Sequence, residues 1–101
     1  RQISRLMKVR WSRLAHDDLR AILERLNAEN PAAAKGFVRR LDGVLRRISR
    51  FPEAAQTIDQ RPHVRRIPLV RHPFVLYYSI GEAEAVILCI RHGAMETPWE
   101  T

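Results

Sequence analysis

The chain has few cysteines and glycines and no long hydrophobic run. Cys89 is its only cysteine, so no disulfide can form within the chain. Its four glycines stand apart from one another, which excludes a glycine-rich phosphate loop. No apolar stretch approaches the roughly 20 residues of a membrane-spanning helix, and the first residues lack the apolar core of a secretion signal. We therefore expect no membrane association and a reducing, cytoplasmic location.

Metal and cofactor chemistry also has little support. The chain has four histidines, none of them at the spacing of a metal site, and Cys89 has no partner thiol. No serine lies in the sharp strand-to-helix turn that exposes a hydrolase nucleophile. We expect neither a metal nor a cofactor.

Positive charge is what the chain has in excess. Lys and Arg number 18 against 11 Asp and Glu, a net charge of +7 over 101 residues. This length suits one domain with a single core. A basic balance favours an acidic partner, either nucleic acid or an acidic protein, although a basic surface also serves solubility.

The sequence from Met7 reads as a natural start. We assign one domain to residues 7–101 and interpret residues 1–6 as a vector remnant or an N-terminal extension.

The first half of the chain predicts one strand and two helices. Val9 and Trp11 alternate with basic residues, which predicts a strand over Lys8–Trp11. Ser12 can cap a helix that ends near residues 27–29. Asn30 followed by Pro31 is a typical start of a second helix, and Phe51-Pro52 ends it. Because the connection is short, the two helices should form an antiparallel hairpin.

The second half predicts a loop and three strands. Residues 53–62 suit a loop, and strands are expected over residues 64–70, 74–80 and 85–90, with a turn at Gly81. The strand over residues 74–80 is apolar on both faces, so we expect a central strand that needs a cover on each side. The predicted fold is an α+β domain. It has an N-terminal strand, an antiparallel helical hairpin and a three-stranded antiparallel meander (β-α-α-β-β-β).

Two groups of basic residues could bind a partner. The second helix carries basic residues opposite its apolar stripe: Lys35, Arg39, Arg40, Arg46, Arg47 and Arg50. Another cluster spans the loop and the following hairpin: Arg61, His63, Arg65, Arg66, Arg71 and His72. Both could bind phosphate or an acidic protein. The alternatives are an ordinary solvated helix face and charges that protect an edge strand.

Arg91 and His92 end the last predicted strand. In a nuclease, the arginine would stabilise a pentavalent phosphorane and the histidine would transfer protons. Alternatively, His92 caps the strand end and Arg91 pairs with a surface carboxylate. A single Arg-His pair is not a motif, so the structural alternative is favoured.

Taken in order, three segments resemble the ParE branch of the ParE/RelE toxin superfamily. They are VRWSRLAHDDLRAILERLNAENPAAA, RRIPLVRHPFVLYYSI and AVILCIRHGAMETPW, and the resemblance covers about Met7 to Trp99. It implies the toxin of a type II toxin–antitoxin system, neutralised by an acidic, ParD-like antitoxin in a hetero-oligomer. ParE-like members inhibit DNA gyrase and block replication, whereas RelE-like members cleave messenger RNA on the ribosome.

Departures from the nuclease pattern favour the gyrase reading. Val75 stands where RelE-like nucleases commonly carry an arginine, and the tail ends in Trp99 rather than a catalytic tyrosine. We therefore expect no catalytic residues. The expected target- or partner-binding residues are Arg39, Arg46, Arg50, Arg65, Arg91, His92 and Trp99. The nuclease alternative would use Arg65, Arg66, Arg91 and His92.

A third possibility is a non-toxic module that binds only its antitoxin. In every case the antitoxin is expected to cover apolar surface that the chain leaves open. A partner strand could add to the sheet at an edge, for which we expect Lys8–Trp11 or Val64–Val70.

Overall fold

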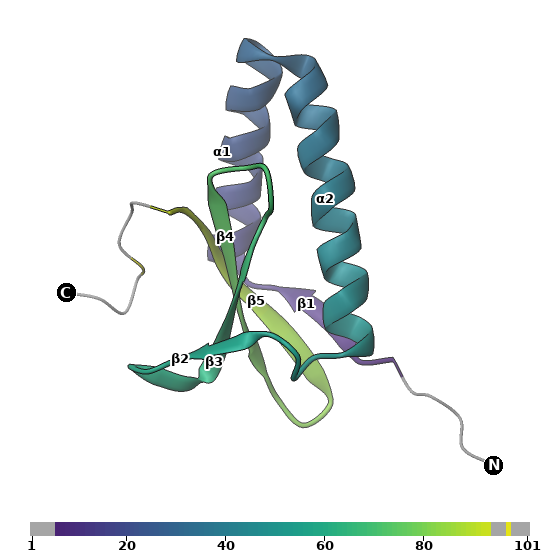
Figure 1. Cartoon of the computed structure of the whole chain (residues 1–101), viewed down its shortest axis with the longest axis vertical. Helices are drawn as coiled ribbons and strands as arrows, with labels where there is room; N and C mark the ends of the chain where they lie inside the picture. The colour runs from purple at the N-terminus through teal and green to yellow at the C-terminus, as the bar shows by residue number, and fades with distance from the viewer. Residues whose placement is uncertain (1–5, 94–96, 98–101) are drawn as a thin grey trace.

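The computed structural model describes residues 6–93 and 97, which form two helices and one five-stranded sheet (Figure 1). The elements in chain order are β1 (Lys8–Trp11), α1 (Arg13–Glu29), α2 (Pro31–Arg50), β2 (Gln56–Ile58), β3 (Arg61–Pro68), β4 (Phe74–Ile80) and β5 (Glu84–His92). The expected α+β fold, with a helical hairpin between the first strand and an antiparallel meander, is confirmed. In the described part of the chain, neither helix is long and apolar enough to cross a membrane.

Local hydrogen bonds set the ends of the helical hairpin. Ser12 caps α1, because its Oγ accepts from the backbone N–H of Ala15 at 3.0 Å. Asn30 serves both helices. Its N–H donates to the Leu26 carbonyl at 2.7 Å, and its Oδ1 accepts from the Ala33 N–H at 3.2 Å. One residue thus ends α1 and starts α2, which forces the sharp reversal at the far end of the hairpin (Figure 1).

The sheet has the order β1-β5-β4-β3-β2, with β1 parallel to β5 and all other neighbours antiparallel. Strand β2 lies inside the segment predicted as a loop. Its three residues show no alternating apolar pattern, so the local sequence does not predict a strand. They form one because they pair with β3. The edge strands are therefore β1 and β2. The prediction that residues 64–70 form an edge is wrong for Arg65 and Arg66, which pair with β2 as well as β4, whereas Ile67 and Pro68 pair with β4 alone.

The core lies between the helices and the sheet. Its fully buried side chains include Phe37 and Ile48 from α2, Leu76 from β4 and Ile87 from β5. Strand β4 is in the middle of the sheet, as predicted. Its neighbours Val75 and Leu76 point to opposite faces, yet both are buried, with Val75 8% exposed. Leu76 lies on the face that the helices were expected to cover. On the opposite face, the expectation that a partner must cover the strand is wrong for Val75.

The buried hydroxyl of Tyr78 and the buried thiol of Cys89 predict a loss of folding stability at alkaline pH. Burial raises the pKa of Tyr78 above its ordinary 10.0, and the tyrosine hydroxyl donates to the Pro52 carbonyl at 2.5 Å. Burial likewise raises the pKa of the Cys89 thiol above 9.0, although the positive charge of Arg91 opposes this shift. The folded state therefore retains protons that the unfolded chain releases.

The resulting stability is complete below pH 9 and falls as the pH rises through the unfolded and then the folded pKa values. We expect the urea midpoint to stay constant up to about pH 9 and to decrease between pH 9 and pH 11. Cys89→Ala should reduce this slope above pH 9, whereas His16→Gln, at an exposed position on α1, should leave it unchanged. A midpoint that stays constant across this range would contradict the prediction.

Candidate functional site

The last strand extends beyond its neighbour β1. Strand β1 pairs only with Glu84–Ile87, so the remainder of β5 has no strand beside it on that side. Helix α1 takes the place of the missing strand. The Ser12 N–H donates to the Ile87 carbonyl and the Ser12 hydroxyl to the Leu88 carbonyl, both at 3.0 Å, and the Asp18 carboxylate accepts from the Ile90 N–H at 3.0 Å. The backbone at the end of β5 is thereby satisfied by Ser12, the cap of α1, and by the Asp18 side chain.

The same carboxylate holds Arg91. The Nε of Arg91 lies 3.9 Å from Oδ2 of Asp18, and the two side chains are only 19% and 15% exposed. This Nε is buried and has no hydrogen-bond partner among the described residues. Arg91 therefore pairs with a carboxylate, as the structural alternative expected, but that carboxylate is mostly buried rather than on the surface.

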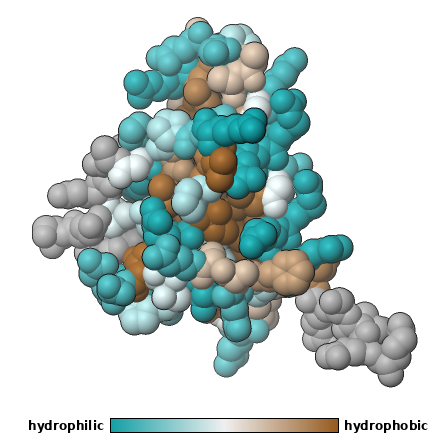
Figure 2. Space-filling model, in the orientation of Figure 1, coloured by the Kyte–Doolittle hydropathy of each residue, from teal (hydrophilic) through white to brown (hydrophobic). Residues whose placement is uncertain are grey.

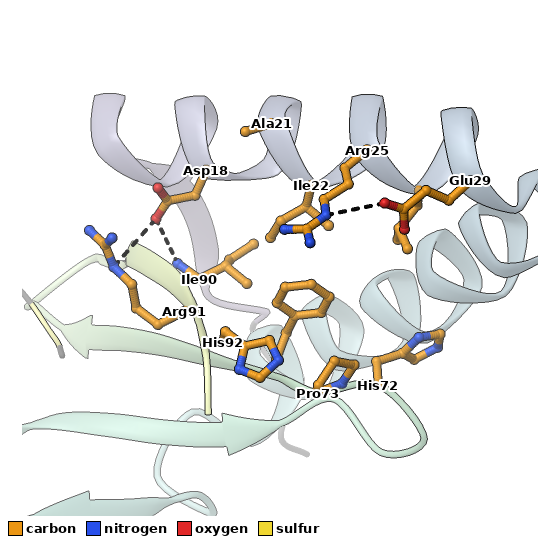
Figure 3. Close-up of a pocket in the computed structure, with 12 residues that line it drawn as sticks. Asp18, Ala21, Ile22, Arg25, Glu29, His72, Pro73, Ile90, Arg91 and His92 are labelled. Carbon is orange, nitrogen blue, oxygen red and sulfur yellow. Dashed lines mark hydrogen bonds and ion pairs between the residues drawn. The ribbon is translucent and has the colours of Figure 1, made fainter. Parts of the chain in front are cut away.

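A cleft of about 520 Å³ opens between α1 and the ends of β4 and β5 (Figure 3). Its wall on α1 carries Asp18, Ala21, Ile22, Arg25, Leu26 and Glu29, and its other wall carries His72, Pro73, Phe74, Ile90, Arg91 and His92. On the helix wall, Arg25 pairs with Glu29 at 3.5 Å (Figure 3). The cleft thus has an apolar base flanked by carboxylates, guanidinium groups and imidazoles.

A row of aromatic rings supports the second wall. The rings of His72, Phe37, Phe74 and His92 meet in that order, with centroids 5.5, 5.6 and 5.8 Å apart and edge-to-face planes. Phe37 belongs to the core and is fully buried. The two histidines of the cleft are consequently positioned through the hydrophobic core rather than by surface loops alone.

This arrangement suits binding better than acid–base chemistry. Each carboxylate of the cleft already pairs with one of its arginines. A ligand that presents both apolar and charged groups, such as a polypeptide segment, matches these walls best. Among residues 6–93 and 97, no three His, Cys, Asp or Glu side chains gather to hold a metal ion.

The structure divides the residues of the nuclease alternative between two faces of the sheet. Arg65 lies opposite Tyr78, on the face of the core, and its Nη1 donates to the carbonyls of Glu53 and Ala55 at 2.9 and 2.7 Å. Arg66 lies on the opposite face by strand alternation. Arg65 thus holds the segment that leads into β2.

Arg91 and His92 also alternate, since Arg91 lies opposite Val75 and His92 opposite Phe74. The register places Arg65 and Arg91 three residues apart along β4 and two strands apart across the sheet, so their backbones are roughly 14 Å apart. The four side chains do not converge on one point.

The expected binding residues form two separate groups. Arg91 and His92 line the cleft, whereas Arg39, Arg46 and Arg50 are exposed on α2 and do not. Arg65 belongs to neither group. Trp99 lies outside the described residues.

The sequence interpretation missed the helix wall of the cleft. Asp18, Arg25 and Glu29 are spaced by seven and four residues, which places them on one side of α1. Their spacing was the one sequence signal that these three residues share a side of the helix. It does not reveal which strand lies beside that side, so in the sequence the three residues look like an ordinary polar helix face.

The fold and the cleft together define a small α+β binding domain, with a helical hairpin on a five-stranded sheet. The profile of the family described as ParE toxin of type II toxin-antitoxin system, parDE, matches residues 9–97. The chain belongs to this family and is thus a toxin of a type II toxin–antitoxin system, which implies an antitoxin partner.

A solved structure agrees with this assignment. The chain is similar to a chain of the structure titled "Chromosomal ParDE TA system from P. aeruginosa", with a TM-score of 0.73 and 26% sequence identity. The match covers 86% of this chain and 96% of the other. The resemblance inferred from the sequence is confirmed. A search among curated proteins finds no match.

Proposed function

We propose that this toxin inhibits DNA gyrase by binding it, without chemistry of its own, and that an acidic antitoxin neutralises it in a hetero-oligomer. The observation that carries this proposal is the side chain opposite Arg91. A nuclease arginine in the central strand would stand at position 75, directly beside Arg91, and this chain has a buried valine there. Arg91 pairs with Asp18 instead, and Arg65 is bound to backbone carbonyls.

The cleft and its surroundings are the proposed binding surface. Arg91 and His92 stand at its β5 wall. Figure 2 shows a hydrophobic area between the β3–β4 hairpin and α2, framed by hydrophilic residues. An amphipathic acidic antitoxin would cover such apolar surface and complement the net charge of +7. The proposed site of action is the cytoplasm, where gyrase meets DNA.

A gyrase assay tests this function. Purified toxin should reduce supercoiling and trap cleaved DNA, and Arg91→Gln with His92→Gln should weaken the inhibition at least tenfold, because both side chains leave the binding surface. His16→Gln with Arg20→Gln, at exposed positions on α1 outside the cleft, is the matched control and should inhibit like the original chain. Unimpaired supercoiling without trapped cleavage complexes would refute the proposal.

Two further measurements separate the alternatives. Cleavage of messenger RNA in a translating extract, abolished by His92→Ala, would support the ribonuclease reading instead. Normal growth of bacteria that express residues 7–101 without an antitoxin would support a module that binds only its antitoxin. Growth arrest with intact messenger RNA agrees with gyrase as the target.

A further inference from the structure

The positive charge of this toxin is concentrated on one helix. Helix α2 contains six cationic side chains and one carboxylate, a net charge of +5 within the +7 of the whole chain. Helix α1 contains three arginines and four carboxylates. A charge that served only solubility would not need this asymmetry, because interspersed signs keep a surface soluble equally well.

Four of these cations lie along one side of the helix, with Asp42 between the second and the third, and we call them the basic stripe: Lys35, Arg39, Arg46 and Arg50. At 3.6 residues per turn, they fall within about 60° of one another around the helix axis. All four are exposed, on the side of α2 away from its buried stripe. Hydrophilic side chains line the outer margin of the molecule beside α2 in Figure 2.

The basic stripe is weakly neutralised within the chain. On α1, Arg13 and Arg25 each pair with a carboxylate four residues later. On the stripe, the one ion pair found among the described residues joins Arg46 to Asp42 at 3.4 Å, and its side chains are 73% and 68% exposed. Such an exposed pair contributes about 0.5 kcal/mol and is exchanged readily for another anion.

We propose that the basic stripe binds the phosphate backbone of duplex DNA. The stripe runs for about 22 Å along a straight helix, and one DNA strand presents a phosphate every 3.4 Å of duplex axis. Three of the four side chains are arginines, whose guanidinium groups form paired hydrogen bonds with phosphate oxygens. The choice of DNA over other polyanions rests on the proposed action on gyrase, which would bring the toxin to DNA. The contact is independent of sequence, since no group on the stripe reads base edges.

Fluorescence anisotropy with the purified toxin and a 20-base-pair duplex tests this proposal without gyrase. Four phosphate contacts predict a plot of log K against log salt concentration with a slope of about −3.6. The variant Arg39→Gln, Arg46→Gln, Arg50→Gln should lose about 2.7 of that slope and weaken binding on the order of 100-fold at 0.1 M salt. Glutamine is a good helix former, so α2 should persist, which circular dichroism verifies.

The matched control removes the same charge from exposed positions outside both the basic stripe and the cleft: Lys8→Gln, Arg13→Gln, Arg20→Gln. It should retain the slope of the original chain. If both triple variants weakened DNA binding equally, net charge alone would explain the binding and the proposal would be overturned. The absence of any DNA binding at 50 mM salt would also overturn it. If the α2 variant no longer binds a fluorescent polyglutamate peptide but still binds DNA like the original chain, the stripe is a surface for an acidic protein and the proposal fails. Gyrase inhibition by a toxin that binds no DNA would refute this inference and leave the proposed function standing.

Discussion

Replacing Asp18 with alanine is expected to lower the free energy of unfolding by about 2–4 kcal/mol. The carboxylate accepts the hydrogen bond of the Ile90 N–H and lies beside Arg91, and the two side chains are mostly buried. Its removal leaves a backbone donor and a cation without partners at the end of β5. Urea denaturation of the purified toxin measures the effect.

Two further variants separate the hydrogen bond from the charge. Asp18→Asn keeps an oxygen that can accept from Ile90 and removes the negative charge, so its effect should be about half as large. Asp17→Ala removes the adjacent carboxylate, which is 57% exposed and 3.8 Å from Arg13, and should change stability by less than about 0.5 kcal/mol. Equal effects of Asp17→Ala and Asp18→Ala would contradict this account of the strand end.

The helices and the central strand were predictable because their signals are local. Ser12 and the Asn30-Pro31 pair cap the helices where the sequence indicates. Strand β4 has the predicted bounds because seven consecutive residues, from Phe74 to Ile80, combine β-forming side chains with a turn at Gly81. Such signals depend on neighbours within a few residues, which the sequence displays directly.

Strand β2 and the helix wall of the cleft depend on contacts between distant residues. Gln56 and Thr57 form a strand only because β3 supplies their hydrogen-bond partners. Asp18 acquires its role from Ile90, 72 positions later in the chain. The sequence located Arg91 and His92 at a strand end, but the parallel pairing of β1 with β5, which leaves that end open to α1, has no local signature.

Phe37 is expected to give the largest effect of any single truncation near the cleft. Phe37→Ala should cost about 3–5 kcal/mol, because the ring is fully buried and contacts both Phe74 and His72 edge-on. Those two residues form part of the cleft wall. The loss should therefore loosen the wall that carries His92 as well as the core, and gyrase inhibition should fall with stability.

The adjacent residue provides the control. Val38 is 46% exposed on the same turn of α2, and Val38→Ala should change the free energy of unfolding by less than about 0.5 kcal/mol. Phe37→Leu fills part of the space and should fall between the two. Urea midpoints at constant slope rank the three variants. If Phe37→Ala unfolded at the same midpoint as Val38→Ala, the row of rings would not support the cleft, and His72 and His92 would have to be positioned by the β3–β4 turn and the strand ends alone.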